Sequence, residues 1–226
     1  MAIAYVRSAG RASSAAPDAG GSFALDATGG NILLVVLASR HFTNTVSSIT
    51  YAGQALTLKS GPIDQPDTGG QRGRIWLYYL VNPPSGSNTL AYTLSSATYA
   101  NACSAEIWSG VDTGDPFGTV ATASGDPSPA TVNVTSSSVQ TVVDAVGIFG
   151  GTTIAVGGGQ TSRDTRDGDD GGGNYSNTRA GHSSEPGAGS VTMSWTFSDA
   201  HASAGWCIIG VPLKPGVANN RAVWVF

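Results

Sequence analysis

The chain has 226 residues, of which 40% are hydrophobic and 31 are glycine, and its net charge at pH 7 is −4. The hydrophobic content is sufficient for a folded core and argues against global disorder. The only lysines are Lys59 and Lys214, so the chain lacks the basic patch that binding to nucleic acid or to an acidic membrane surface requires. The longest apolar run, Ile32–Ala38, is far shorter than the ~20 residues that cross a bilayer, and the N-terminal residues do not have the pattern of a secretory signal peptide.

The first residues of the chain predict β-strands separated by turns. Ala2–Arg7 alternates weakly and predicts an edge strand, whereas Ser8–Gly21 is small and polar and predicts a loop. Ile32–Ala38 is apolar at every position, which predicts a central strand covered on both faces. Ile49–Tyr51 and Ala55–Leu58 flank a glycine-containing turn and predict a hairpin.

Arg74–Val81 predicts a long strand rich in aromatic residues. Since side chains alternate along a strand, one face should carry Ile75, Leu77 and Tyr79. The other face should carry Trp76, Tyr78 and Leu80. Strands are also expected at Asn88–Ser95 and Ala100–Ser109.

The chain contains an internal repeat. Tyr78–Val111 reads as a strand end, a Pro/Ser/Gly turn, a strand, a polar turn and a strand, and His182–Val211 has the same order of features. An apolar strand precedes each copy, at Asn31–Ser39 and at Thr141–Phe149. We therefore expect quasi-repeats at about 28–120 and 131–215, followed by a tail at 216–226.

The repeats could form two sandwiches in tandem or two interleaved halves of one sandwich. The joint Ser124–Ala130 is short and no Pro/Ser-rich linker separates the halves, which favours one domain over residues 1–226. No sustained helical periodicity occurs, so the protein is expected to be all-β.

Each repeat has one cysteine, Cys103 or Cys207, at nearly matching places. A disulfide would be geometrically possible if the two strands were neighbours. Two buried free thiols are the favoured alternative because no signal peptide is visible.

Gly157–Gly173 is the most irregular segment and predicts a mobile surface loop. Its acidic residues superficially resemble a calcium loop: Asp164, Asp167, Asp169 and Asp170. The spacing fails, because the twelfth place counted from Asp167 is Thr178 rather than glutamate. A solvated loop screened by arginines is expected, without a metal ion or a cofactor.

Catalytic signatures are weak. Only His41, His182 and His201 could act as a base near neutral pH, and no nucleophile-elbow or metalloprotease motif occurs. Glu106, beside Trp108 on a predicted strand, is expected on the exposed face of its sheet; the alternative is a buried acid with a raised pKa. No enzymatic activity is expected.

Two groups of aromatic residues could contact a ligand or a partner. The first could form a platform for sugar rings, although packing in the core is favoured: Trp76, Tyr78, Trp108, Trp195 and Trp206. The second is the C-terminal cluster Val223, Trp224, Val225 and Phe226. This tail either adds a strand to its own sheet or docks onto a partner.

Residues Tyr79–Thr119, YLVNPPSGSNTLAYTLSSATYANACSAEIWSGVDTGDPFGT, resemble a β-sandwich module of tailed-phage virion proteins and of some bacterial surface or secreted proteins. The resemblance implies a jelly-roll-like β-sandwich, here of about a dozen strands, with a structural or adhesive role and no catalytic residues. The expected function is a non-enzymatic virion protein, assembled in the host cytoplasm. In particular, we expect a homo-oligomeric head-decoration or cement protein that binds the major capsid protein or another virion protein. The alternative is a carbohydrate-binding module of a tail fibre or cell-surface protein, which would bind a glycan.

Overall fold

The computed structural model describes residues 1–13, 18–41, 43–66, 73–98, 100–168, 177–199 and 204–217. The described residues form 17 β-strands and no helix, and the strands make up four antiparallel sheets. The all-β prediction is therefore confirmed, with more strands than the dozen expected.

The strands of the first half are β1 (Ala4–Ala12), β2 (Asp18–Asp26), β3 (Ile32–Ser39), β4 (Val46–Tyr51), β5 (Gln54–Ala55), β6 (Thr57–Asp64), β7 (Arg74–Val81), β8 (Ser87–Thr98) and β9 (Asn101–Ser109). Those of the second half are β10 (Ala121–Gly125), β11 (Ala130–Thr135), β12 (Thr141–Phe149), β13 (Gly151–Val156), β14 (Thr161–Gly168), β15 (Thr178–Pro186), β16 (Ser190–Asp199) and β17 (Gly205–Leu213).

Each half forms one five-stranded and one smaller sheet. The first half has the orders β1-β9-β3-β7-β6 and β2-β8-β4-β5, and the second half has β10-β17-β12-β15-β14 and β11-β16-β13. The two halves correspond strand by strand. In the five-stranded sheets, β1, β9, β3, β7 and β6 correspond to β10, β17, β12, β15 and β14; in the smaller sheets, β2, β8 and β4 correspond to β11, β16 and β13. Strand β5 has no counterpart in the second half. The internal repeat is thus present in the topology. We call β1–β9 repeat 1 and β10–β17 repeat 2; each begins earlier than the sequence similarity indicated.

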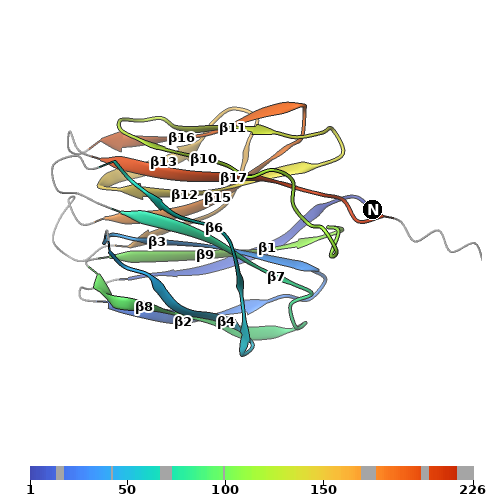
Figure 1. The fold of residues 1–226 in the computed structure, drawn as a ribbon, viewed down its shortest axis with the longest axis horizontal. Helices are drawn as coiled ribbons and strands as arrows, with labels where there is room; N and C mark the ends of the chain where they lie inside the picture. The colour runs from blue at the N-terminus through green and yellow to red at the C-terminus, as the bar shows by residue number, and fades with distance from the viewer. Residues whose placement is uncertain are drawn as a thin grey trace, which may run out of the picture.

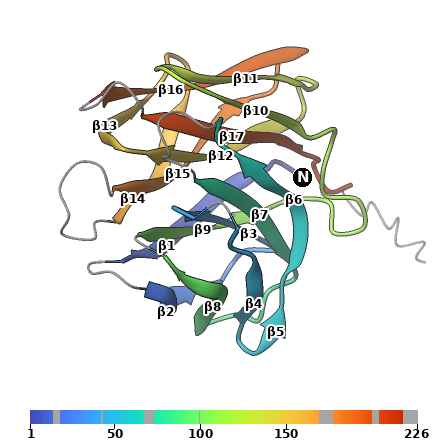
Figure 2. The same cartoon turned by 60° about the vertical axis from the view of Figure 1, so that its left-hand side comes forward.

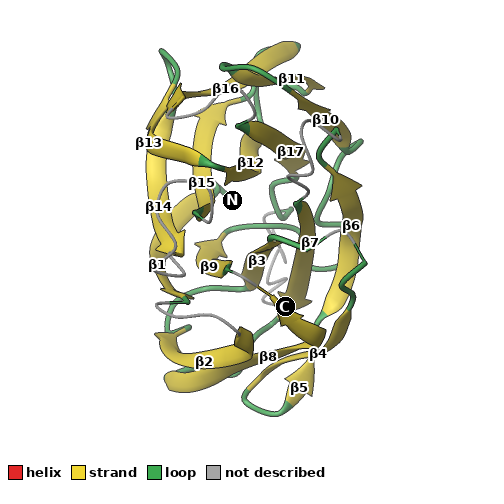
Figure 3. Cartoon of the chain, turned by 90° about the vertical axis from the view of Figure 1, so that its left-hand side faces the viewer, coloured by secondary structure: helices red, strands yellow, loops and turns green. Residues whose placement is uncertain are grey.

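The four sheets are stacked as layers, with the five-stranded sheets in the middle (Figures 1 and 3). We call the five-stranded sheets the inner sheets and the two smaller sheets the outer sheets. No sheet mixes strands of the two repeats, which differs from the interleaved sandwich expected from the sequence. Each repeat instead forms its own two-layer sandwich, and the second apolar face of each inner sheet is covered by the other repeat. Jelly-roll connectivity within a repeat remains a prediction.

The two inner sheets meet in a pseudo-symmetric way. Seen end-on, β1 lies beside β14 at one edge, and β6 lies beside β10 at the other (Figure 3). Because β1 corresponds to β10 and β6 to β14, exchanging the repeats exchanges the two contacts. The repeats are therefore related by an approximate twofold axis, the arrangement of an isologous dimer within one chain.

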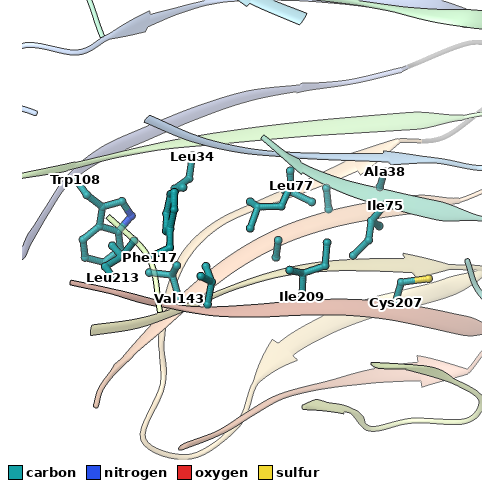
Figure 4. Close-up of a cluster of buried hydrophobic side chains, with 14 of the residues drawn as sticks. Leu34, Ala38, Ile75, Leu77, Trp108, Phe117, Val143, Cys207, Ile209 and Leu213 are labelled. Carbon is teal, nitrogen blue, oxygen red and sulfur yellow. The ribbon is translucent and has the colours of Figure 1, made fainter. Parts of the chain in front are cut away.

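The hydrophobic core has three parts. Between the inner sheets, Leu34, Ile75 and Leu77 of repeat 1 face Val143 and Ile209 of repeat 2 (Figure 4). We call this part the inter-repeat core. The other two parts lie between the inner and outer sheet of each repeat, and we call them the outer cores. Every residue of β3 is buried, because its side chains alternate between the inter-repeat core and the outer core of repeat 1.

Other details of repeat 1 follow from its sequence. The predicted faces of β7 are confirmed, because Ile75, Leu77 and Tyr79 contact the inter-repeat core while Trp76, Tyr78 and Leu80 contact the outer core. The predicted hairpin is formed by β4 and β5. Its two turn residues, Ala52 and Gly53, have φ of 50° and 78°, as a type I′ turn requires.

The loop predicted for Ser8–Gly21 is wrong at both ends, since β1 continues to Ala12 and β2 begins at Asp18. The small residues allow close approach. A Cβ at Gly10 would lie 2.5 Å from the Cys103 carbonyl oxygen and 2.5 Å from the Arg166 side chain.

The cysteines lie on the corresponding strands β9 and β17 but face different parts of the core. Cys103 packs in the outer core of repeat 1, and Cys207 packs in the inter-repeat core. Both are buried free thiols, as favoured from the sequence, and the disulfide alternative is wrong.

Candidate functional site

The C-terminal cluster of Val223, Trp224, Val225 and Phe226 lies outside the described residues, as does His201. Whether the tail adds a strand or docks onto a partner therefore stays a prediction. The aromatic residues considered for a sugar platform are all buried, with exposed fractions of 9% or less: Trp76, Tyr78, Trp108, Trp195 and Trp206. Core packing is confirmed for them, and none offers an open ring face to a sugar.

The acidic segment is a strand in part. Thr161–Gly168 forms β14 at the edge of the inner sheet of repeat 2, so the prediction of a loop is wrong for these residues. Charged side chains are common on edge strands, because they discourage pairing with another chain. Asp164 is paired with Arg166 and Asp167 with Arg179, each at 2.8 Å. Asp169 and Asp170 lie outside the described residues.

Calcium and EDTA are expected to leave the melting temperature of the protein unchanged within about 1 °C. The two described aspartates already have arginine partners, which a cation would have to displace. Within the described ranges, no three His, Cys, Asp or Glu side chains are grouped closely enough to hold a metal ion. Differential scanning fluorimetry in 5 mM calcium and in EDTA would measure the melting temperature. A real calcium site would raise it clearly, since a ligand at 1,000 times its Kd stabilises the folded state by roughly 4 kcal/mol.

Glu106 is the largest departure from expectation. The sequence predicted an exposed face, but the side chain is 0% exposed and points from β9 between the two inner sheets. Its Oε1 lies 3.5 Å from Nδ1 of His182 on β15, so the contact joins the two repeats. Burial raises the pKa of Glu106, and the nearby His182 opposes part of this shift. The prediction of an exposed face on β9 is wrong because the inner sheet of repeat 2 covers that face, which the local sequence pattern does not indicate.

Both ring nitrogens of His182 lie close to backbone carbonyl oxygens. Its Nδ1 lies 3.0 Å from the Asp144 carbonyl oxygen, and its Nε2 lies 3.2 Å from the Ser104 carbonyl oxygen. A carbonyl oxygen can only accept, so a His182 nitrogen that carries hydrogen donates to the carbonyl oxygen beside it. Neither oxygen of the Glu106 carboxylate has a hydrogen-bond partner among the described residues.

A second buried carboxyl belongs to Asp144 on β12, which is 1% exposed and faces the outer core of repeat 2. The Trp195 indole donates to it at 2.8 Å, and the Ser183 amide and hydroxyl donate at 2.8 and 2.9 Å. Burial raises the pKa of Asp144 to about 7, although these hydrogen bonds act in the opposite direction. Because Glu106 and Asp144 are sealed from solvent, their contacts serve the fold rather than a soluble substrate.

A solvent-accessible cleft of about 400 Å³ lies between the repeats, at the edge where β1 meets β14. Ile3, Ala4, Tyr5 and Trp108 of repeat 1 form one wall. The other wall comes from repeat 2: Thr141, Thr161, Arg163, Ser184, Glu185 and Pro186. Trp108 closes the inner end, next to the buried Glu106.

Arg163 is the central polar residue of this cleft. It lies at a β-bulge, between Ser162 and Asp164, and bulges re-aim side chains at many functional sites. Its guanidinium carbon lies 4.7 Å from the Tyr5 ring centre and 5.5 Å from that of Trp108, and its Nε donates to Ser184 Oγ at 2.8 Å. Among the described residues, no carboxylate forms an ion pair with Arg163, and its guanidinium is held by Ser184 and the two rings.

The corresponding bulge in repeat 1 holds Lys59 on β6, between Leu58 and Ser60. The Lys59 ammonium lies 4.8 Å from the Phe117 ring centre, so the approximate twofold axis places a cation on an aromatic ring at both edges. This pair of cation–ring contacts was not predicted from the sequence. The signal was a basic residue at matching places in the two repeats.

The described residues contain no helix long and apolar enough to span a bilayer. No model of a known protein family matches the chain, and no curated protein is significantly similar to it.

Proposed function

We propose that this protein is a non-enzymatic structural protein of a tailed-phage virion, which decorates the head and stabilises the shell by binding the major capsid protein. Two observations support the proposal: the resemblance of Tyr79–Thr119 to modules of phage virions, and the chemistry of the two outer faces of the stack. The chemistry of the outer faces is the stronger support.

Both outer faces are lined by small, uncharged side chains. The outward residues of the outer sheet of repeat 1 are Ser22, Ala24, Ser48, Thr50, Thr89, Ala91 and Thr93, and we call this surface the β8 face. Those of repeat 2 are Thr131, Asn133, Thr135, Thr153, Ala155, Thr192, Ser194, Thr196 and Ser198, and we call this surface the β16 face. The charged residues of β2 are its first and last, Asp18 and Asp26.

Such faces suit contact with other proteins. The centres of protein–protein interfaces are depleted of charge, because charges are costly to remove from water. The faces lie on opposite sides of the four-layer stack, so one molecule could contact two neighbours (Figures 1 and 2). A protein that binds only the assembled lattice stabilises that lattice by mass action.

Lysine substitutions on the two faces test the proposal. Thr93→Lys and Thr192→Lys, singly and together, should leave the unfolding free energy within about 0.5 kcal/mol of wild type, as is usual for exposed sites. At least one of them should weaken binding to capsids ~100-fold or more, because it buries an unpaired charge in the contact. Thr113→Lys, in an exposed turn away from both faces, is the matched control. Co-sedimentation with assembled capsids measures binding, and full binding by the double variant would refute docking through these faces.

The alternative function, a carbohydrate-binding module of a tail fibre or cell-surface protein, loses the support of the five buried aromatic residues. A glycan array discriminates between the two functions, since a decoration protein has no need to bind sugars.

A further inference from the structure

We infer that the cleft between the repeats is a binding site for a small organic carboxylate, which Arg163 holds through the open end of its guanidinium. The site would be present whether or not the protein decorates a phage head. Three features of the cleft support it: a cation without a counterion, the way in which this cation is fixed, and the side chains around it.

Arg163 is a cation without a counterion. Five other arginines each form an ion pair with an aspartate: Arg7, Arg11, Arg74, Arg166 and Arg179. In the part of the chain that the structure describes, no carboxylate lies within ion-pair distance of Arg163. Acidic residues outnumber basic ones in this chain, so the lack of a partner is specific to this position. An unpaired cation in a cleft attracts anions from solution.

Two nearby acids do not take the place of a counterion. The Asp164 carboxylate pairs with Arg166 and accepts from Ser104 Oγ. Glu106 is 0% exposed, and burial raises its pKa, which favours the neutral form of the carboxyl. A ligand is therefore the remaining source of negative charge for Arg163.

The Glu185 side chain points away from the cleft. It lies opposite Val142, which packs in the outer core of repeat 2, and its carboxylate lies beside Gly159. Ser184 and Pro186 face the cleft instead, because side chains alternate along β15. An anion bound in the cleft would therefore not meet the Glu185 carboxylate.

Arg163 is fixed before any ligand binds. Its Nε donates to Ser184 Oγ at 2.8 Å, and its carbonyl oxygen accepts from Ser8 Oγ of repeat 1 at 3.1 Å. Its guanidinium carbon lies near the rings of Tyr5 and Trp108, which themselves pack edge to face at 5.6 Å. A donor that is held in place loses little conformational entropy when a ligand binds.

The geometry of this guanidinium suits a carboxylate. Because Nε is engaged with Ser184, the two terminal nitrogens form the open end of the planar fork, and they have no hydrogen-bond partner among the described residues. A carboxylate can accept from both nitrogens with its two oxygens. Arg163 supplies the only positive charge among the described residues that line the cleft, so a phosphate dianion would be only half neutralised.

The remaining side chains can hold the rest of such a ligand. Thr161 pairs with Ser184, and Thr141 pairs with Pro186, so these residues share the face of the sheet that lines the cleft. The two threonine hydroxyls can donate to a carboxylate, and Ile3 and Pro186 offer apolar surface to a small hydrocarbon body. The volume of about 400 Å³ is within the range of small-molecule sites, about 300 to 1,000 Å³.

The test is titration of the 226-residue protein with acetate, butyrate and benzoate at constant ionic strength, followed by NMR chemical-shift changes. At least one of them should bind saturably with a millimolar Kd and perturb the Trp108 indole signal. Arg163→Met keeps the aliphatic stem against the rings but removes the charge, so it should weaken binding about tenfold or more. Arg163→Lys should recover only part of the affinity, because an ammonium lacks the planar fork.

Two controls separate a specific contact from general attraction. Lys59→Met removes the same charge at the corresponding bulge of the other edge and should leave the Kd unchanged. Butyramide, a neutral analogue of butyrate with the same shape, should bind about tenfold more weakly or less. Urea midpoints of the variants, compared with wild type, distinguish a lost contact from a lost fold.

Three results would overturn the inference. The first is the absence of saturable binding by all three carboxylates. The second is binding that Arg163→Met does not weaken, or that Lys59→Met weakens equally. The third is tighter binding of inorganic phosphate than of any of the carboxylates, which would identify a phosphate site in their place.

Discussion

The free energy of unfolding should fall by about 2–3 kcal/mol between pH 5 and pH 8 through Asp144 alone. The folded protein holds this carboxyl at a pKa of about 7, because burial disfavours the charged form. In the unfolded chain the same group titrates near pH 4. Glu106, also buried with a raised pKa, acts in the same direction.

The direction of this change follows from the number of protons that the folded and the unfolded states bind. Between about pH 4 and pH 7 the folded state holds a proton that the unfolded state has released, so raising the pH favours unfolding. The stabilisation is complete below the unfolded pKa and is lost as the pH rises through the folded one. Asp26, whose pKa is lowered by its contacts with Thr28 and Arg7, has the opposite effect only below about pH 4.

Urea unfolding followed by tryptophan fluorescence at pH 5 and pH 8 measures the difference. Asp144→Asn is the informative variant. Relative to wild type it should lose more stability at pH 5 than at pH 8, because its amide does not titrate and lacks the stabilisation that the raised pKa of Asp144 gives the wild type below about pH 7. It should also show a flatter dependence on pH. A wild-type protein that gains stability from pH 5 to pH 8 would contradict the assignment.

Repeat 1 alone, expressed as residues 1–120, should be insoluble or molten. Removing repeat 2 exposes one whole face of the inner sheet, including Ile32, Leu34, Val36, Ile75 and Leu77. Each such side chain contributes about 1.5–3 kcal/mol when fully buried, so the five together are comparable to the roughly 5–15 kcal/mol that stabilises a whole domain. Gel filtration and thermal unfolding of the fragment measure the outcome.

Mixing this fragment with residues 121–226 during refolding is the control, since the inter-repeat core can then form. We expect the mixture to recover a soluble complex with a cooperative transition. A soluble, monomeric fragment with a sharp transition of its own would mean that each sandwich is an independent domain.

The sequence was most informative where a strand is apolar on both faces. The uninterrupted run in β3 predicts cover on two sides, and the alternation in β7 assigns the side chains of residues 75–80 to the correct parts of the core. Both patterns are local, so they can be interpreted without knowledge of the partner layer. The layer that buries the second face of each strand could not be identified from the sequence. A second sandwich and the other half of the same sandwich would bury that face equally well.

Glu106 and β14 show where local patterns fail. Glu106 alternates with apolar residues and resembles a residue of an exposed face until repeat 2 covers it. Its strand β9 pairs directly with the doubly covered β3, and this neighbourhood was the available signal. In β14 the charges and glycine suggested a loop, although an edge strand tolerates the same composition.

The cleft could not be predicted from the sequence. Tyr5 and Arg163 come from different repeats and are brought together only by the stacking of the inner sheets. Their meeting also depends on the bulge at Arg163, which a single sequence does not reveal.

The most direct test of the proposed function is the copy number of this protein in phage particles. Quantitative mass spectrometry would be applied to particles purified from cells that carry the gene, with the major capsid protein as the internal standard. A head-decoration protein should be present in a fixed, lattice-like ratio to the major capsid protein. Its absence from the particles, or its presence in only a few copies per particle as for a tail fibre, would contradict the account.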